Sequence, residues 1–547
     1  MHTFLALAAV GLLSAASAVA SSCGRRSNII FILSDDQDLE MGSIDYMPLL
    51  NKYLKSKGTT YERHYCTTAL CCPARASILT GKMAHNHNIT DVVLPFGGYT
   101  KVVQEGINDD YLPLWLQEAG WDTYYVGKLW NAHSTDNYNS PRARGWNGSD
   151  FLLDPYTYDF YNPTFVRNYD EPIHHENEYS TDLVSEKALA FIDDASKSAR
   201  PFFLGVAPVA PHSNTEYVKV NGTTRTVTSA PRPAKRHENL FEDVVVPRTP
   251  HFNPETPSGV YWVRDLPRLN QTHIDANDLY YRQRLRSLQA VDEMIEAIVR
   301  KLEEHSILDD TYIIYTSDNG FHVGQHRLEP GKFCPFEEDV HIPLFIRGPG
   351  VPENERAPIV TTHTDLAPTF LSIVGASMRG DLDGEAIPLT KRSIDASIGS
   401  RYEHVQVEYW GYAVSEGDYS YQGYLIPNNT YKALRVDDPY QLKNIYPSEP
   451  VGGDETAFFG RPLAQVLTRF DALTMVLKTC KSEGCVKPWK LLHPAGDVAS
   501  LKDAVDPKFD DFYENDVPKV KYDHCSQGFF LEFEGPIYNQ SVAFIPG

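Results

Sequence analysis

The sequence has no excess of basic residues. Lysine and arginine together number 50 against 72 aspartate and glutamate residues, so the formal net charge at pH 7 is −22. A chain of this charge is repelled by phosphate backbones, which excludes the usual electrostatic mode of nucleic-acid binding. Cysteine is also sparse, with 8 in 547 residues. This excludes a small domain held together mainly by disulfides, and the length predicts a large buried core.

The sequence also has no apolar run long enough to span a bilayer. A short apolar run at residues 4–13 precedes Ala-Val-Ala at residues 18–20, which predicts a cleavable signal peptide over residues 1–20. The last four residues, Phe-Ile-Pro-Gly, are not a signal for retention in the endoplasmic reticulum. We therefore expect a secreted, extracellular protein. Six N-x-S/T sequons fit that compartment and predict a glycoprotein modified at Asn88, Asn147, Asn221, Asn270, Asn428 and Asn539.

Short apolar runs predict an open α/β sheet. Residues 28–33 and 312–315 are largely apolar and each run stops close to a Ser-Asp pair, as expected for parallel strands buried on both faces. Residues 278–304 carry apolar side chains at three- and four-residue spacing, which predicts an amphipathic helix before the second strand. We expect further strands at residues 201–206 and 340–346. Residues 213–260 show no periodicity and are expected to form a long ordered loop or lid.

The pattern changes near residue 400. Residues 21–400 are therefore interpreted as one domain, and residues 401–547 as a smaller subdomain with antiparallel strands, one of them at 431–436. Cys480 and Cys485 enclose a short loop and are the predicted disulfide, whereas the other pairings stay open. The adjacent Cys71 and Cys72 do not resemble ordinary disulfide cysteines. A helix before the disulfide is predicted by the spacing of Leu463, Val466, Phe470, Leu473 and Leu477.

A pair of residues with side-chain oxygens follows each of the two buried strands. Asp35-Asp36 comes after the first strand and Asp318-Asn319 after the second. The carboxyl ends of strands are where ligands bind in open α/β sheets, and four oxygen donors suit a hard cation such as Ca²⁺ or Mg²⁺. The alternative is that these residues only form turns or cap helices.

A third segment, CCPARASILTGK at residues 71–82, predicts a helix with an anion site at its start. Pro73 suits the first helical position and Gly81 suits the end of the helix. Cys71 would then lie at the helix N-terminus, where free N–H groups attract anions, and Arg75 would lie about one turn further on. The alternative is a buried pair of cysteines on a short helix.

The spacing of Cys71, Pro73, Arg75, Thr80 and Gly81 resembles the C-x-P-x-R-x-x-x-x-T-G signature of the type I sulfatases. The Cys-Cys-Pro form is most similar to fungal secreted arylsulfatases and to the glucosamine-6-sulfatase branch. The resemblance implies an alkaline-phosphatase-like mixed sheet flanked by helices, with residues 21–400 as the catalytic domain. It also implies that formylglycine-generating machinery oxidises Cys71 to formylglycine during secretion, since Cys71 lies two residues before the proline.

The resemblance assigns further roles residue by residue. It implies one Ca²⁺ bound by Asp35, Asp36, Asp318, Asn319 and the modified Cys71. Lys128 in Gly-Lys, Lys332 in a second Gly-Lys, and Arg75 are expected to stabilise the sulfate, and His212 to protonate the leaving group. Many relatives carry histidine two residues after the first of these lysines, where this sequence has Trp130. His322 is near the second metal motif and receives no role.

The implied activity is hydrolysis of sulfate esters, with aryl sulfates as the expected substrates. Carbohydrate sulfates and phosphonate monoesters or phosphodiesters are the alternative substrates, and an inactive anion-binding glycoprotein is the alternative without catalysis. Compared with the fungal relatives, a piece of the C-terminal sheet is missing between Val436 and Asp437. This departure concerns the C-terminal subdomain and none of the expected catalytic positions.

Overall fold

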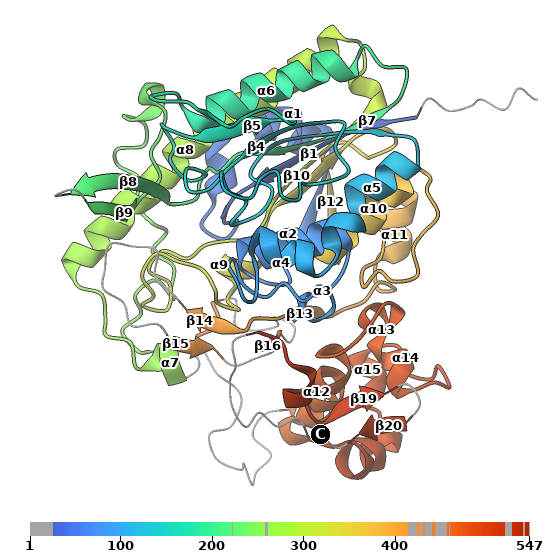
Figure 1. Ribbon diagram of the computed structural model, residues 1–547. Helices are drawn as coiled ribbons and strands as arrows, with labels where there is room; N and C mark the ends of the chain where they lie inside the picture. Colours follow the sequence, from blue (N-terminus) through green and yellow to red (C-terminus); the bar gives the residue numbers. More distant parts are fainter. Residues whose placement is uncertain are drawn as a thin grey trace, which may run out of the picture.

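The computed structural model describes residues 26–220, 223–257, 261–413, 424–426, 430–432, 440–442, 457–458, 460–519, 528–539 and 542–545. Its centre is a ten-stranded mixed sheet with the strand order β12-β2-β11-β10-β1-β7-β3-β4-β5-β6 (Figure 1). The strands of this sheet are β1 (Asn28–Ser34), β2 (Thr59–Tyr65), β3 (Asp122–Gly127), β4 (Gly148–Leu152), β5 (Thr164–Arg167), β6 (Ile173–His174), β7 (Phe202–Ala207), β10 (Thr311–Ser317), β11 (Leu344–Arg347) and β12 (Glu355–Thr362).

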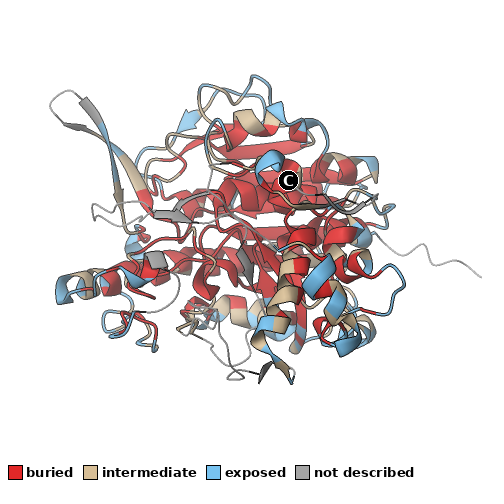
Figure 2. Ribbon diagram, turned by 90° about the horizontal axis from the view of Figure 1, so that it is seen from below, coloured by how far each residue is buried: buried red, intermediate tan, exposed pale blue. Residues whose placement is uncertain are grey.

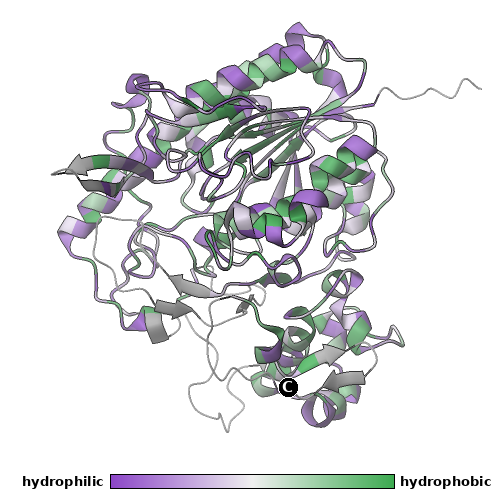
Figure 3. Ribbon diagram, viewed as in Figure 1, coloured by the Kyte–Doolittle hydropathy of each residue, from purple (hydrophilic) through white to green (hydrophobic). Residues whose placement is uncertain are grey.

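Both faces of the sheet are covered by helices, which explains the continuously apolar central strands. Strand β1 points Phe31 into one hydrophobic cluster and Ile30 and Ile32 into the other, since successive side chains of a strand point to opposite faces. Figure 2 shows this buried interior, and Figure 3 shows α6 carrying both hydrophobic and hydrophilic residues, as a covering helix should. The helices of this part are α1 (Pro48–Tyr53), α2 (Cys71–Thr80), α3 (Ala84–His87), α4 (Gly98–Gln104), α5 (Leu112–Glu118), α6 (Ser180–Ala195), α7 (Tyr261–Arg264), α8 (Gln271–Glu304), α9 (Glu337–Val340), α10 (Leu366–Ile373) and α11 (Lys391–Ser397).

The predicted α/β class, the strands at 28–33, 201–206 and 312–315, and the long helix are confirmed. Helix α8 begins earlier than its apolar pattern, at Gln271, because the Asn270 side chain accepts a hydrogen bond from the His273 N–H and caps the helix. The expected strand at 340–346 is wrong at its start. Val340 ends the one-turn helix α9, and Pro343 lacks the N–H that a strand ladder needs, so β11 begins at Leu344.

The expected loop at 213–260 is also wrong in part. Strands β8 (Asn214–Val220) and β9 (Thr223–Ser229) pair antiparallel and project from the body of the molecule (Figure 1). Threonine, valine and tyrosine favour strands, and the sequence Asn-Gly favours a two-residue turn. Residues 221–222, which carry this sequence, lie outside the described residues.

No helix in the part of the chain that the structure describes is long and apolar enough to cross a membrane.

The C-terminal part has its own small core. Helix α12 (Leu463–Leu477) matches the predicted helix, and Cys480 and Cys485 form the predicted disulfide. The antiparallel strands are present as two-stranded pairs, although residues 433–439 around the expected deletion lie outside the described residues. The elements here are β13 (Val405–Val407), β14 (Gly411–Ala413), β15 (Tyr424–Ile426), β16 (Thr430–Lys432), β17 (Ala457–Phe458), β18 (Arg461–Pro462), α13 (Glu483–Val486), α14 (Pro488–Leu492), α15 (Leu501–Ala504), β19 (Ile537–Asn539) and β20 (Val542–Ile545).

The predicted glycosylation positions are spread over the molecule. Asn147 and Asn270 are exposed, and Asn88 is half-buried. Asn539 is the last residue of β19, and Asn221 and Asn428 lie outside the described residues, as does the predicted signal peptide.

Helix α3 joins the C-terminal part to the sheet domain. The buried His85 imidazole pairs through Nδ1 with the Glu408 carboxylate, and its Nε2 lies 2.7 Å from the Cys480 carbonyl. Asn86 donates to the same carbonyl at 2.8 Å, and Met83 packs in the C-terminal hydrophobic cluster. Burial opposes protonation of His85, but the Glu408 carboxylate outweighs it and raises the pKa of His85 to about 9.

This junction should make the protein less stable at alkaline pH. A folded-state pKa of about 9, above the ordinary value of 6.5, gives a stabilisation that is complete below pH 6.5 and is lost as pH rises through 9. Its size is on the order of 3 kcal/mol. We expect His85→Gln to flatten the fall in the free energy of unfolding between pH 6 and pH 9, measured by urea denaturation.

His87 provides the matched control. It is buried on the same helix, but burial and the His85 charge lower its pKa to about 3, so it stays neutral across this range. His87→Gln should leave the pH dependence as in the wild type. An unchanged slope in His85→Gln would contradict the assignment.

Candidate active site

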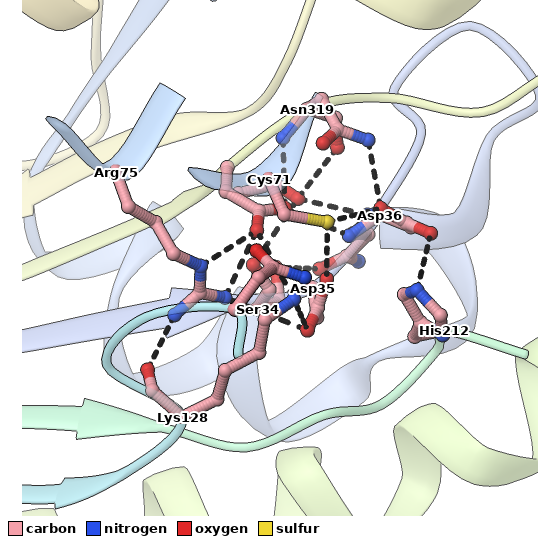
Figure 4. Close-up of polar contacts among 12 residues, drawn as sticks. Ser34, Asp35, Asp36, Cys71, Arg75, Lys128, His212 and Asn319 are labelled. Carbon is pink, nitrogen blue, oxygen red and sulfur yellow. Dashed lines mark hydrogen bonds and ion pairs between the residues drawn. The ribbon is translucent and has the colours of Figure 1, made fainter. Parts of the chain in front are cut away.

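Three carboxylates meet at the carboxyl end of the central strands. Strands β1 and β10 are parallel neighbours with Ser34 opposite Ser317, so Asp35-Asp36 and Asp318-Asn319 leave the sheet side by side. The Asp36 N–H donates to Asp318 Oδ1 at 3.0 Å, and Asn319 Nδ2 donates to Asp36 Oδ1 at 2.8 Å. The structure thus brings all four predicted oxygen ligands into one buried cluster. Figure 4 shows Asp35, Asp36 and Asn319 of this set.

Cys71 lies at the first residue of α2 and points into this cluster. Its Sγ is 3.6 Å from Asp35 Oδ1 and 3.8 Å from Asp36 Oδ1 (Figure 4). The helix begins at Cys71, two residues before the predicted first position, so Pro73 is its third residue. Proline is tolerated there because the first four N–H groups of a helix have no partner within the helix. Gly81 ends the helix at φ +66°, as expected. Cys71 and Cys72 are both free thiols.

Each carboxylate is paired with a buried cation. Lys128 Nζ lies 2.6 Å from Asp35 Oδ2, and Lys332 Nζ lies 2.7 Å from Asp36 Oδ1. Arg75 Nε donates to Asp318 Oδ2 at 2.9 Å, and its Nη2 lies 3.5 Å from Asp35 Oδ2. Three carboxylates and three cations therefore balance in formal charge. This balance keeps the charged forms tolerable in a site that excludes bulk water.

His212 approaches the cluster from the segment after β7. Its Nε2 lies 3.6 Å from Asp36 Oδ2, while its Nδ1 lies 2.9 Å from the Ser213 carbonyl. Lys128 follows Gly127. Gly127 has a φ of +102°, which favours glycine, and a Cβ atom at this position would clash with the Ala207 carbonyl oxygen. The sequence-predicted residues Cys71, Arg75, Lys128, His212 and Lys332 all lie in this one site.

Burial and charge act in opposite directions on the ionisable groups of the site. Burial raises the pKa of Asp35, but Lys128, His212 and Arg75 outweigh it, and the net pKa lies below the ordinary value. Burial raises the pKa of the Cys71 thiol well above its ordinary value despite Lys128 and Lys332. An unmodified Cys71 is therefore a neutral thiol and a weak nucleophile.

The comparison with known proteins agrees with the sequence motifs. The family model described as Sulfatase matches residues 27–376, which include every member of the cluster. The chain belongs to the sulfatase family.

Individual relatives of this sulfatase cover most of its length. It is 37% identical to an arylsulfatase of Volvox carteri over 554 residues, covering 94% of this chain and 84% of that protein. It is 32% identical to the human N-acetylglucosamine-6-sulfatase over 401 residues, covering 71% of this chain and 68% of that protein. A solved structure of a protein in complex with its substrate D-glucosamine-2-N,6-O-disulfate has the same fold, with a TM-score of 0.58, 23% identity, and coverage of 72% and 85%. The predicted fold and family are confirmed.

Sulfatases generally use Ca²⁺ and formylglycine, and the residues of this sulfatase fit both. The buried Asn319 Oδ1 has no hydrogen-bond partner among the described residues, although it lies beside three carboxylates. A buried amide oxygen without a hydrogen-bond partner is a suitable ligand for a hard cation. Cys71 Sγ lies beside Asp35 Oδ1 and Asp36 Oδ1, so a modified side chain at position 71 would belong to the same set of ligands.

The sequence interpretation missed residues that hold this cluster from behind. The buried Arg284 of α8 donates from Nη2 to the Asp36 carbonyl at 2.5 Å and to Asp38 Oδ1 at 2.9 Å, and from Nη1 to the Pro211 carbonyl at 3.3 Å. It therefore ties the first acidic pair to the His212 segment. The sequence did contain a signal for this residue: Arg284 stands next to Leu285 on the apolar face of a predicted amphipathic helix, and a buried arginine needs partners.

Trp130 and His322 lie outside the carboxylate cluster. Trp130, which stands where many relatives have histidine, packs in a hydrophobic cluster with residues such as Tyr111. His322 lies 2.7 Å from Asp339 Oδ1 through its Nδ1, and its backbone pairs with that of Gly331. It thereby fixes the loop that carries Lys332.

Replacing Arg284 should destabilise the sulfatase strongly. Arg284→Met leaves the Asp38 carboxylate buried without its cation, and losing one partner of a buried ion pair costs about 3–5 kcal/mol. The free energy of unfolding in urea measures this loss. Arg282→Met is the matched control, because Arg282 is half-buried and, among the described residues, its side chain donates only to the Val244 carbonyl. Equal losses in the two variants would contradict the role of Arg284.

Proposed function

We propose that this sulfuric ester hydrolase acts on aryl sulfates and uses a formylglycine made from Cys71 together with one Ca²⁺. The proposed calcium ligands are Asp35, Asp36, Asp318, Asn319 and the side chain at position 71. The main support is the meeting of residue 71 with three carboxylates and three cations in one buried cluster. The arylsulfatase name of the Volvox relative, which matches 94% of this chain, supports the aryl substrate.

The state of Cys71 supports modification at this position. Burial keeps the thiol neutral, so a cysteine here would lack the thiolate needed for nucleophilic attack. When present, hydrated formylglycine supplies an oxygen nucleophile and Ca²⁺ offsets the charge of the sulfate.

The remaining residues act by charge and by proton transfer. Lys332 Nζ lies 3.2 Å from Cys71 Sγ as well as beside Asp36, which suits it to hold the sulfate oxygens near residue 71. Lys128 contributes a second buried cation. Arg75 uses its guanidinium on Asp318 and Asp35, so we assign it to holding these carboxylates more than to the sulfate. His212 donates the proton that the leaving oxygen takes when the S–O bond breaks.

The compartment follows from the same proposal. Residues 1–20 direct the chain into the secretory pathway, where formylglycine-generating machinery acts on residue 71 before secretion. The exposed Asn147 and Asn270 are the best-placed glycan acceptors among the described sequons. Residues 21–400 form the catalytic domain and residues 401–547 the C-terminal subdomain.

Carbohydrate sulfates are a second candidate class of substrate. The human relative is named an N-acetylglucosamine-6-sulfatase and is 32% identical over 401 residues. Comparing the rate for 4-nitrophenyl sulfate with that for glucosamine 6-sulfate separates the two classes. Faster turnover of the sugar sulfate would replace the aryl assignment, and turnover of phenyl phosphonate esters alone would replace both.

The nucleophile is tested by replacing each cysteine of the pair. Cys71→Ala should lower kcat/KM for 4-nitrophenyl sulfate by at least about 10³-fold, because it removes the nucleophile. Cys72→Ala should remain active, with stability lowered by about 1–3 kcal/mol from the cavity that it leaves. Mass spectrometry of the tryptic peptide 64–75 from secreted wild-type protein should show an aldehyde at residue 71. An unmodified thiol there, in protein from a host that modifies other sulfatases, would leave an anion-binding glycoprotein as the better description.

The metal is tested without measuring activity. At a Ca²⁺ concentration about 100 times its Kd, binding should stabilise the folded protein by about 2.7 kcal/mol and raise the Tm. Asp318→Asn should reduce this Ca²⁺-dependent shift, whereas Asp381→Asn, at a half-buried ion pair with Lys82 and Arg379 that lies outside the cluster, should keep it. An identical shift in both variants would place the calcium elsewhere.

A further inference from the structure

The ring of Tyr158 touches two of the proposed catalytic side chains. It stacks on the His212 imidazole, with ring centroids 4.2 Å apart and planes inclined by 22°. The Lys128 ammonium lies over the same ring, 4.8 Å from its centroid. Tyr158 is half-buried, whereas the Lys128 and His212 residues that its ring contacts are buried.

Tyr158 is held at both ends. Its phenolic oxygen accepts a hydrogen bond from Asn131 Nδ2 at 2.8 Å, and its backbone carbonyl accepts one from the Thr215 N–H at 3.0 Å. Asn131 belongs to the loop that carries Lys128, and Thr215 lies in β8, three residues after His212. The ring is therefore tied to the two segments whose side chains it contacts.

The chemistry of the ring suits both neighbours. The negative face of an aromatic ring attracts an ammonium group, and this attraction is strongest where water is excluded. A flat ring against an imidazole limits rotation of the imidazole, which fixes the direction of its Nε2. Burial keeps the pKa of Tyr158 well above its ordinary value, so the ring stays neutral beside Asp35 and Cys71.

Resting on the proposed function, we propose that Tyr158 is a positioning residue that sets the relative placement of Lys128 and His212 and thereby decides which leaving groups the enzyme can expel. As an oxygen of the side chain at position 71 forms a bond to sulfur, the bond between sulfur and the leaving oxygen breaks, so the sulfo group passes to residue 71. The leaving oxygen keeps the electron pair and takes a proton from His212, which later recovers one from water. An acidic phenol leaves readily without this proton, whereas a weakly acidic phenol or a sugar alcohol needs it. A displaced His212 therefore harms poor leaving groups most.

The test compares ring-retaining and ring-lacking variants over a series of aryl sulfates whose parent phenols range from strongly to weakly acidic. Tyr158→Phe keeps the ring and should stay within about threefold of the wild type for every substrate, since it loses one neutral hydrogen bond. Tyr158→Leu and Tyr158→Met remove the ring. Their kcat/KM should fall by about 10-fold for 4-nitrophenyl sulfate, through Lys128, and by about 10²-fold or more for phenyl sulfate.

The slope of log kcat/KM against the pKa of the leaving phenol is the decisive quantity, because loss of folded protein would lower every rate equally and leave this slope unchanged. It should become steeper in both ring-lacking variants and stay the same in Tyr158→Phe. Tyr156→Leu is the matched control, since the Tyr156 ring contacts His174 and Tyr217. Its slope should equal that of the wild type.

The outcomes separate two kinds of failure. If the wild type hydrolyses no member of the series, both the proposed function and this inference fail. If the wild type turns over and the ring-lacking variants lose the same factor for every leaving group, only the role of Tyr158 is overturned. Because two ring-lacking variants are used, Tyr158→Leu and Tyr158→Met, the comparison can still be made when one of them does not fold.

Discussion

The balance of buried charge is the constraint on which the site depends. Asp35, Asp36 and Asp318 lie in an interior where a lone carboxylate would be strongly disfavoured, and each is therefore paired with a cation. Because these cations come from α2, the loop after β3 and the loop after β10, the balance also fixes how these three segments meet. The same pairing links stability and the proposed chemistry, since two of the cations that neutralise the carboxylates, Lys128 and Lys332, are those that would face a sulfate.

The sheet supplies the positions that make this balance possible. Parallel pairing of β1 with β10, and of β1 with β7, brings the ends of three strands to one edge. Segments almost 300 residues apart in sequence then lie within hydrogen-bond distance. Arg284 and Tyr158 extend the arrangement outward, Arg284 by holding backbone carbonyls behind the carboxylates and Tyr158 by contacting Lys128 and His212.

The junction with the C-terminal part uses the same principle at a second place. His85 is charged in the interior because Glu408 lies against it, and the disulfide loop is held through its Cys480 carbonyl. Helix α3 follows α2 after a short turn, so this junction also supports the helix that carries Cys71. The two buried sets of charges thus lie at the two ends of one continuous segment, residues 71–87.

The sequence by itself determined the α/β class, the buried strands, the long helix, the Cys480–Cys485 disulfide and the family, because each depends on local spacing or a short motif. It also predicted Asp35, Asp36, Asp318, Asn319, Cys71 and Arg75 from motifs at strand ends and at a helix start, and Lys128, His212 and Lys332 from the resemblance to the sulfatases; the structure places these nine side chains together. Only the tertiary structure decided which cation neutralises which carboxylate and how α3 is attached to the C-terminal part. It also revealed Arg284 and Tyr158, whose partners are distant in sequence. Contacts of that kind are set by strand register and packing, for which a single sequence carries no periodic signal.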